Sequence, residues 1–170
     1  MIGIWSWFTF WLVMHILFVI VAFGPTFTFP ALAAMARKDP AHAVAYSKVI
    51  HFVEKRMTIP LAVFVPLFGT GLIYTSPGHI DLWKSEWLLI SIVLYIAAFS
   101  FALFVQLPNS GRMLDALAKM PPGPPPPGAQ PPPELVALGK KLQFGGMYLT
   151  ASVLVMLLLM VWRPGASFLS

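Results

Sequence analysis

The chain has 170 residues, of which 58% are hydrophobic and 10% are charged, and its formal net charge is +5. A soluble domain carries about 45–50% apolar and about 25% charged residues, so this composition indicates an integral membrane protein. The absence of cysteine excludes disulfides, thiolate metal sites and cysteine nucleophiles. Because the positive charges flank apolar segments, where basic residues face anionic headgroups, they do not indicate nucleic-acid binding.

Four apolar segments without Asp, Glu, Lys or Arg are each long enough to cross about 30 Å of lipid as a helix. We therefore predict an all-α fold, a four-helix transmembrane bundle formed by residues 1–170 as a single integral membrane domain. The predicted spans are approximately 5–35, 58–75, 87–107 and 142–162. The first segment lacks the basic flank and the short apolar run of a cleaved signal peptide, so we expect it to remain as a helix.

The first span, within "FWLVMHILFVIVAFGP", contains His15. It lies about ten residues after Trp5, which places it about 15 Å deep, near the middle of the bilayer. Its helical neighbours are apolar or aromatic, among them Trp11 and Phe18, and such a slot suits a porphyrin. Neutral imidazole is a common axial ligand of haem iron. We therefore take His15 as the candidate cofactor-binding and metal-binding residue, with haem b as the candidate cofactor.

A structural interpretation of His15 stays equally open. In it, the imidazole ring forms a hydrogen bond with a hydroxyl or carbonyl group of a neighbouring helix, for example at Ser100, Thr150 or Ser152. His51 is too far along the second helix to share an iron with His15, because it lies about 22 Å from the centre of the second apolar segment. Its charged neighbours in sequence predict an interfacial, hydrated side chain.

The second helix is predicted to begin near Pro40 and to project from the membrane, because apolar residues recur at helical spacing from Ala41 to Val53. "FGP" at residues 23–25 predicts a bend in the first helix. The glycines of "GTG" at residues 69–71 and of "GG" at residues 145–146 predict close packing between helices.

The loops after the first and third spans carry nine basic residues, whereas the other side carries Lys84 and Arg163. The positive-inside rule therefore predicts an N-out/C-out orientation, with tryptophans such as Trp5 and Trp162 at the outer ends of the spans. The segment "MPPGPPPPGAQPPPE" predicts a stiff proline-rich cytoplasmic loop at residues 120–133.

The motifs of common hydrolases and nucleotide-binding proteins are absent. Soft methionine ligands such as Met14 and Met147 leave copper as a second metal, although methionine is also an ordinary core residue.

The segments "VEKRMTIPLAVFVPLFGTGL", "WLLISIVLYIAAFSFALFVQLPNSGRM" and "GGMYLTASVLVMLLLMVWRPG" follow His15 in this order. In this pattern the chain resembles a predicted integral membrane protein family, the domain of unknown function numbered 2269. That family is distantly similar to HemJ-type protoporphyrinogen oxidases and copper-resistance D-type membrane proteins. The resemblance implies a four-helix bundle whose first-helix histidine binds haem or metal. The HemJ type relies on a lysine in its third span, which is absent here, where the strongly polar residue is Gln106.

Three functions follow as hypotheses: a protein that binds a b-type haem or porphyrin through His15 for electron transfer or haem handling, a non-enzymatic membrane subunit or scaffold, and a copper or small-solute permease. Whether the protein is an enzyme stays open. We expect its partners to be the lipid bilayer and either a membrane protein or a second copy in a homodimer, with no nucleic acid. The expected location is the cell membrane, as a multi-pass protein of the bacterial inner membrane.

Overall fold

The computed structural model describes residues 6–77, 80–121 and 130–164, and in these residues it contains helices and no strand. Four long helices are apolar enough to cross a membrane: Trp7–Lys38, Pro40–Thr75, Glu86–Ala118 and Pro133–Trp162. The predicted all-α, four-helix transmembrane bundle is therefore confirmed. Trp5, His79 and residues 122–129 of the predicted proline-rich loop lie outside the described residues.

The first three long helices are each divided by a short segment with a different hydrogen-bonding pattern. The first consists of α1 (Trp7–Phe23), the 3₁₀ segment η1 (Gly24–Thr28) and α2 (Phe29–Lys38). The second consists of the short η2 (Pro40–His42), α3 (Ala43–Val53), the π-helical segment η3 (Glu54–Thr58) and α4 (Ile59–Thr75). The third consists of α5 (Glu86–Phe101), the π-helical segment η4 (Ala102–Gln106) and α6 (Leu107–Ala118). The fourth, α7 (Pro133–Trp162), is continuous.

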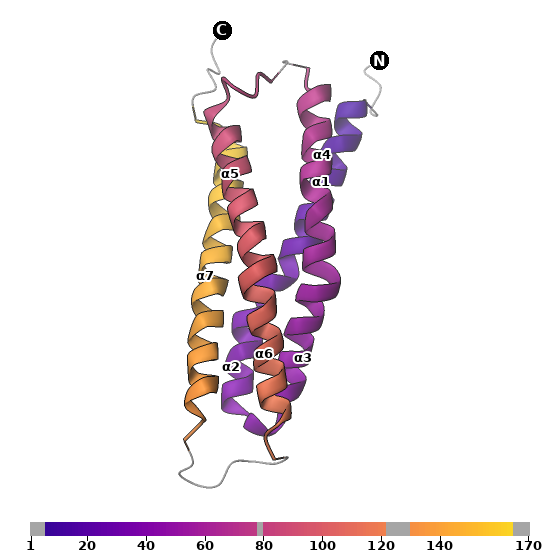
Figure 1. Ribbon diagram of the computed structural model, residues 1–170. Helices are drawn as coiled ribbons and strands as arrows, with labels where there is room; N and C mark the ends of the chain where they lie inside the picture. The colour runs from indigo at the N-terminus through magenta and orange to yellow at the C-terminus, as the bar shows by residue number, and fades with distance from the viewer. Residues whose placement is uncertain (1–5, 78–79, 122–129, 165–170) are drawn as a thin grey trace.

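The start of α1 and the end of α7 lie at one end of the bundle, whereas the α2–α3 connection, the end of α6 and the start of α7 lie at the other (Figure 1). The predicted basic loops therefore share one end of the molecule, which we call the basic end. Which side of the membrane this end faces stays a prediction. The second helix begins at Pro40, as predicted.

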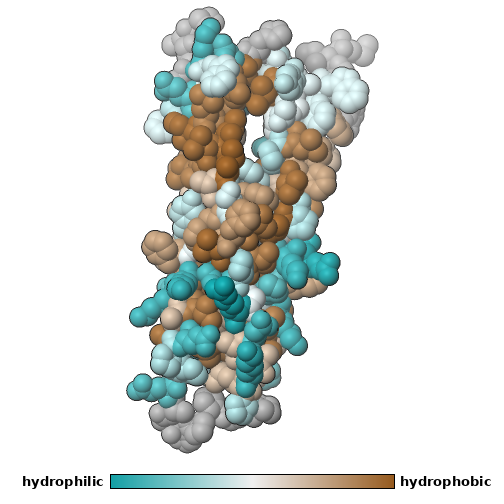
Figure 2. Space-filling model, viewed as in Figure 1, coloured by the Kyte–Doolittle hydropathy of each residue, from teal (hydrophilic) through white to brown (hydrophobic). Residues whose placement is uncertain are grey.

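Each long helix exceeds the thickness of the bilayer core. A helix of 30 to 36 residues is about 45–54 Å long, whereas the hydrocarbon core is about 30 Å thick. Apolar surface covers the half near the termini, and hydrophilic side chains gather in the half toward the basic end (Figure 2). The extra length therefore forms a more polar half, built from α2, α3, α6 and the first turns of α7.

The helices pack as pairs in the apolar half, where α1 lies against α4 and α5 lies against α7 (Figure 1). In the polar half α3 also packs against α2 and α6, so the pairs join there. Glycines permit the close approaches: a Cβ atom at Gly71 would overlap the Trp11 ring, and one at Gly145 would overlap Gln106. Gly146 has open space around it, so the packing predicted for "GG" applies to its first glycine.

Candidate functional site

His15 lies between α1 and α4, where its ring contacts one carbonyl group. Its Nδ1 atom donates a hydrogen bond to the backbone carbonyl of Val65, at 2.9 Å. A Cβ atom added at Gly69 would lie 3.3 Å from the ring, so this glycine lets α4 approach the imidazole. The bonding partner is a carbonyl of a neighbouring helix, as the structural interpretation of His15 expects. It belongs to the second helix and not to any of the hydroxyl groups that the sequence suggested.

Aromatic side chains of α1 and α4 pack together near His15, where the sequence predicted a porphyrin slot. Phe18 packs against Phe64 and Phe68, with ring centroids 5.2 and 4.9 Å apart, and Trp11 packs against Phe68 at 5.8 Å. Within the described residues, no three His, Asp or Glu side chains gather as metal ligands. The Nε2 atom of His15 is the remaining ligand atom. Haem binding through His15 therefore stays a prediction from the sequence, and we derive no step through a haem.

His51 belongs to a different part of the bundle. It lies on α3, fourteen residues before Val65 along the same long helix, which corresponds to about 21 Å. Its Nδ1 atom lies 2.7 Å from the Ser110 hydroxyl of α6, and its side chain is half-buried. The prediction of an interfacial, hydrated His51 therefore describes only part of the side chain, because one edge of the ring contacts Ser110 inside the bundle.

The two π-helical segments have the same local cause. The N–H groups of Ile59 and Leu107 bond to carbonyls five residues back, at Glu54 and Ala102. In each case the next residue is a proline, at position 60 or 108. Proline has no N–H group and its ring crowds the carbonyl four residues back, so the preceding turn widens. Such widened turns occur often at functional sites in helical proteins.

Polar side chains from both interrupted helices meet beside these turns. We call this group the junction cluster; its members are His51, Glu54, Thr58, Gln106 and Ser110. The Glu54 carboxyl lies beside the Ser110 hydroxyl and the Gln106 amide, and the Ser110 hydroxyl also contacts the ring of His51. The Gln106 amide donates to the Leu142 carbonyl of α7, at 3.3 Å. The cluster therefore links the second, third and fourth long helices.

Two atoms of the junction cluster lack a partner in the part of the chain that the structure describes. They are one carboxylate oxygen of Glu54 and the hydroxyl of Thr58, and both are buried. The Glu54 side chain is only 7% exposed. A buried carboxylate is costly unless it is paired, hydrogen-bonded or protonated, and a polar residue inside a membrane bundle commonly marks an ion or proton pathway. The cluster can bind a proton or another cation.

The sequence analysis did not identify this cluster. Glu54 precedes the second predicted span, at residues 58–75, whereas the structure buries its side chain inside the bundle. Glu54 stands between Val53 and Lys55 in a segment rich in charge, so it resembled an ordinary headgroup-facing residue. The available signal was the pair of prolines that follow Thr58 and Gln106 at a spacing of two residues, because both predict a disturbed turn.

Comparisons with known proteins agree with this architecture without assigning a reaction to it. A family model described as predicted integral membrane protein, DUF2269, matches residues 9–164. No curated protein and no solved structure matches the chain.

Proposed function

The chain belongs to the DUF2269 family of predicted integral membrane proteins, and from this premise we propose that it transfers protons within the membrane through Glu54. The observation that carries the proposal is the buried, incompletely bonded carboxylate of Glu54. This carboxylate lies beside the Ser110 hydroxyl, which also contacts the half-buried His51. This function falls closest to the small-solute permease among the hypotheses drawn from the sequence.

The proposed transfer uses three side chains. A protonated His51 gives the proton on its Nδ1 atom to the Ser110 oxygen. The Ser110 hydroxyl, which donates to the Leu107 carbonyl at 3.3 Å, turns from that carbonyl and gives its own proton to the Glu54 carboxylate. The imidazolium becomes neutral imidazole, the carboxylate becomes a carboxylic acid, and the hydroxyl is regenerated. The 2.7 Å contact between His51 and Ser110 is within the range of a strong hydrogen bond, and imidazole gains and loses protons near neutral pH.

Two features support passage beyond the cluster. The Thr58 hydroxyl, which has no partner among the residues that the structure describes, lies one turn farther along the same helix from Glu54, toward the apolar half. In that half an opening separates the α1–α4 pair from the α5–α7 pair, near the end that carries the termini (Figure 2). Water that entered this opening and reached the Thr58 hydroxyl would extend the path that leads from the basic end through His51, Ser110 and Glu54.

Proton flux into vesicles tests the proposal. The purified protein is reconstituted in liposomes that contain a pH-sensitive dye, and a potassium gradient with valinomycin supplies the voltage. We expect the protein to change the internal pH faster than empty liposomes do, and Glu54→Gln, which cannot ionise, to return the rate to that of empty liposomes. Glu54→Asp should keep part of the flux.

The matched control is Glu86→Gln, which removes an exposed carboxylate from the first turn of α5. It should conduct like the unmodified protein. Flux equal to that of empty liposomes before any substitution, or unchanged flux in Glu54→Gln, would refute the proposal. Haem binding through His15, a scaffold role, a homodimer and a location in the bacterial inner membrane stay predictions from the sequence.

A further inference from the structure

A groove lies where η4 and α6 face α7, outside the junction cluster. Its volume is about 620 Å³. Three basic side chains, Arg112, Lys140 and Lys141, line it together with the aromatic side chains of Phe104 and Phe144. The phenylalanines are 73% and 74% exposed, so they border the groove without closing it. One groove therefore combines positive charge with open apolar surface.

The two kinds of side chain are arranged in the same order on both walls. On the third helix the chain runs from Phe104 to Arg112 toward the basic end, whereas α7 runs from Lys140 to Phe144 away from it. Because the two helices run in opposite directions (Figure 1), both walls place the phenylalanine toward the apolar half and the basic residue toward the basic end. The groove is basic at one end and apolar at the other, which matches a lipid molecule with an anionic head and an apolar tail.

A buried amide adds a directional group to the groove. Asn109 is 9% exposed and lines the groove between Phe104 and Arg112 in sequence. Its side chain forms no hydrogen bond with another residue in the described ranges 6–77, 80–121 and 130–164. An amide in this position can bond to a phosphate or ester oxygen, which a simple patch of surface charge would not provide.

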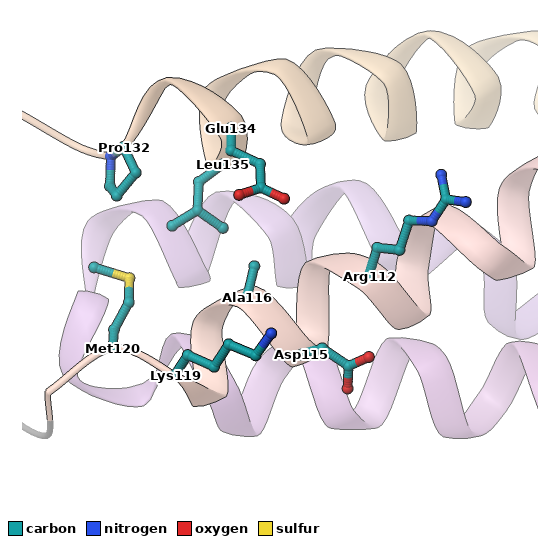
Figure 3. A pocket seen from close by; sticks show the side chains of 8 residues that line it. All are labelled: Arg112, Asp115, Ala116, Lys119, Met120, Pro132, Glu134 and Leu135. Carbon is teal, nitrogen blue, oxygen red and sulfur yellow. The ribbon is translucent and has the colours of Figure 1, made fainter.

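Charge distinguishes this groove from its neighbour. The neighbouring groove, of about 330 Å³, lies at the ends of α6 and α7 and shares Arg112. It includes the carboxylates of Asp115 and Glu134, and Figure 3 shows Glu134 reaching from α7 toward α6. The larger groove is lined by no acidic residue, and none of its basic side chains forms an ion pair within the described part of the chain. An anion is therefore favoured in the larger groove.

From this polarity we infer that the groove between η4–α6 and α7 binds one anionic glycerophospholipid. Its phosphodiester headgroup lies among Arg112, Lys140 and Lys141, and its acyl chains lie along Phe104 and Phe144. Basic pockets between membrane helices, at the level of the headgroups, recognise anionic lipids in this way. The site is independent of the proposed proton path, because none of its charged residues belongs to the junction cluster.

Native mass spectrometry of the detergent-solubilised full chain tests this inference. The protein is titrated with dioleoyl phosphatidylglycerol and, separately, with zwitterionic dioleoyl phosphatidylcholine. We expect one phosphatidylglycerol to bind at least about tenfold more tightly than phosphatidylcholine, since each of the three basic residues favours binding of an anionic lipid by about fivefold. The combined variant Arg112→Gln, Lys140→Gln and Lys141→Gln should lose this preference.

The matched control removes the same charge from exposed basic residues of α2 and α3, as Arg37→Gln, Lys38→Gln and Lys48→Gln. The control should keep the phosphatidylglycerol preference. Equal loss in both variants would show that diffuse charge holds the lipid and would overturn the inference. Displacement of the bound lipid by equimolar inorganic phosphate would also overturn it, because the groove would then recognise a free anion without its chains.

Discussion

His15 and Glu54 are both ionisable residues inside the bundle, but their surroundings differ. The Nδ1 atom of His15 has one carbonyl partner and the ring lies among packed aromatic side chains. Glu54 lies in a network that crosses three long helices, yet one of its oxygens and the nearby Thr58 hydroxyl have no partner in the described residues. A polar group whose bonds are satisfied stabilises a fold, whereas an unsatisfied polar atom in a buried site needs an explanation, such as a catalytic role, a bound water or ion, or strain.

The largest expected effect on stability concerns the glycine that lets α7 approach the junction cluster. A Cβ atom at Gly145 would overlap Gln106 and press on Phe101. We therefore expect Gly145→Ala to lower the free energy of unfolding by about 1–3 kcal/mol, the usual cost of overpacking, measured by denaturant titration in mixed micelles.

Gly146→Ala is the control for this overpacking effect, because a Cβ atom there meets nothing within 4 Å. It should leave stability unchanged or raise it by up to about 1 kcal/mol, since alanine favours the helix more than glycine does. Equal destabilisation by both variants would show that α7 does not approach η4 as closely as described.

The Thr58 hydroxyl offers a test with the opposite sign. If it is buried without a partner, the nearly isosteric Thr58→Val removes a desolvated group and should raise the free energy of unfolding by about 1 kcal/mol. The gain should come with slower proton flux, because the hydroxyl lies on the proposed path.

Thr75→Val is the counterpart of this substitution. The Thr75 hydroxyl donates to the Gly71 carbonyl at 2.7 Å, so its loss should lower stability by about 0.5–1.5 kcal/mol. If Thr58→Val proved as destabilising as Thr75→Val, the Thr58 hydroxyl would have to form a hydrogen bond. The junction cluster would then differ less from His15, whose Nδ1 atom has a partner.

The sequence was sufficient for the overall fold because span length and charge depend on local composition. Four uncharged apolar segments predicted four helices, and Pro40 predicted the start of the second one. The junction cluster could not be predicted in this way, because composition does not show which faces of distant helices meet. His15 was conspicuous because its neighbours in sequence are apolar. Glu54 was not, because its burial arises from contacts with Ser110 and Gln106, more than fifty residues away.

A substitution at Tyr95 tests whether a hydrogen bond in the apolar half replaces one that a proline removes. Pro66 has no N–H group to bond the Ala62 carbonyl four residues back, and the Tyr95 hydroxyl donates to that carbonyl from α5. Tyr95→Phe should therefore lower the free energy of unfolding by about 1 kcal/mol.

In a Pro66→Ala background the restored helical N–H group can take over this role, so Tyr95→Phe should cost less there. The difference, measured as a double-mutant cycle, should be about 0.5–1 kcal/mol. A cost that is the same in both backgrounds would mean that the proline does not create the need for Tyr95.

At His15 the expected effect is confined to stability. His15→Leu removes one hydrogen bond to the Val65 carbonyl, so it should lower the free energy of unfolding by about 1 kcal/mol and leave proton flux unchanged. Absorption spectra of the purified protein, oxidised and then reduced with dithionite, should show no Soret band that depends on His15. A band that disappears in His15→Ala would contradict this and restore haem binding, because it would require the aromatic side chains around His15 to rearrange and admit a porphyrin. Without such a band, a histidine deep in an apolar span is explained by the single carbonyl that it bonds, and the chemistry of the bundle is concentrated at Glu54.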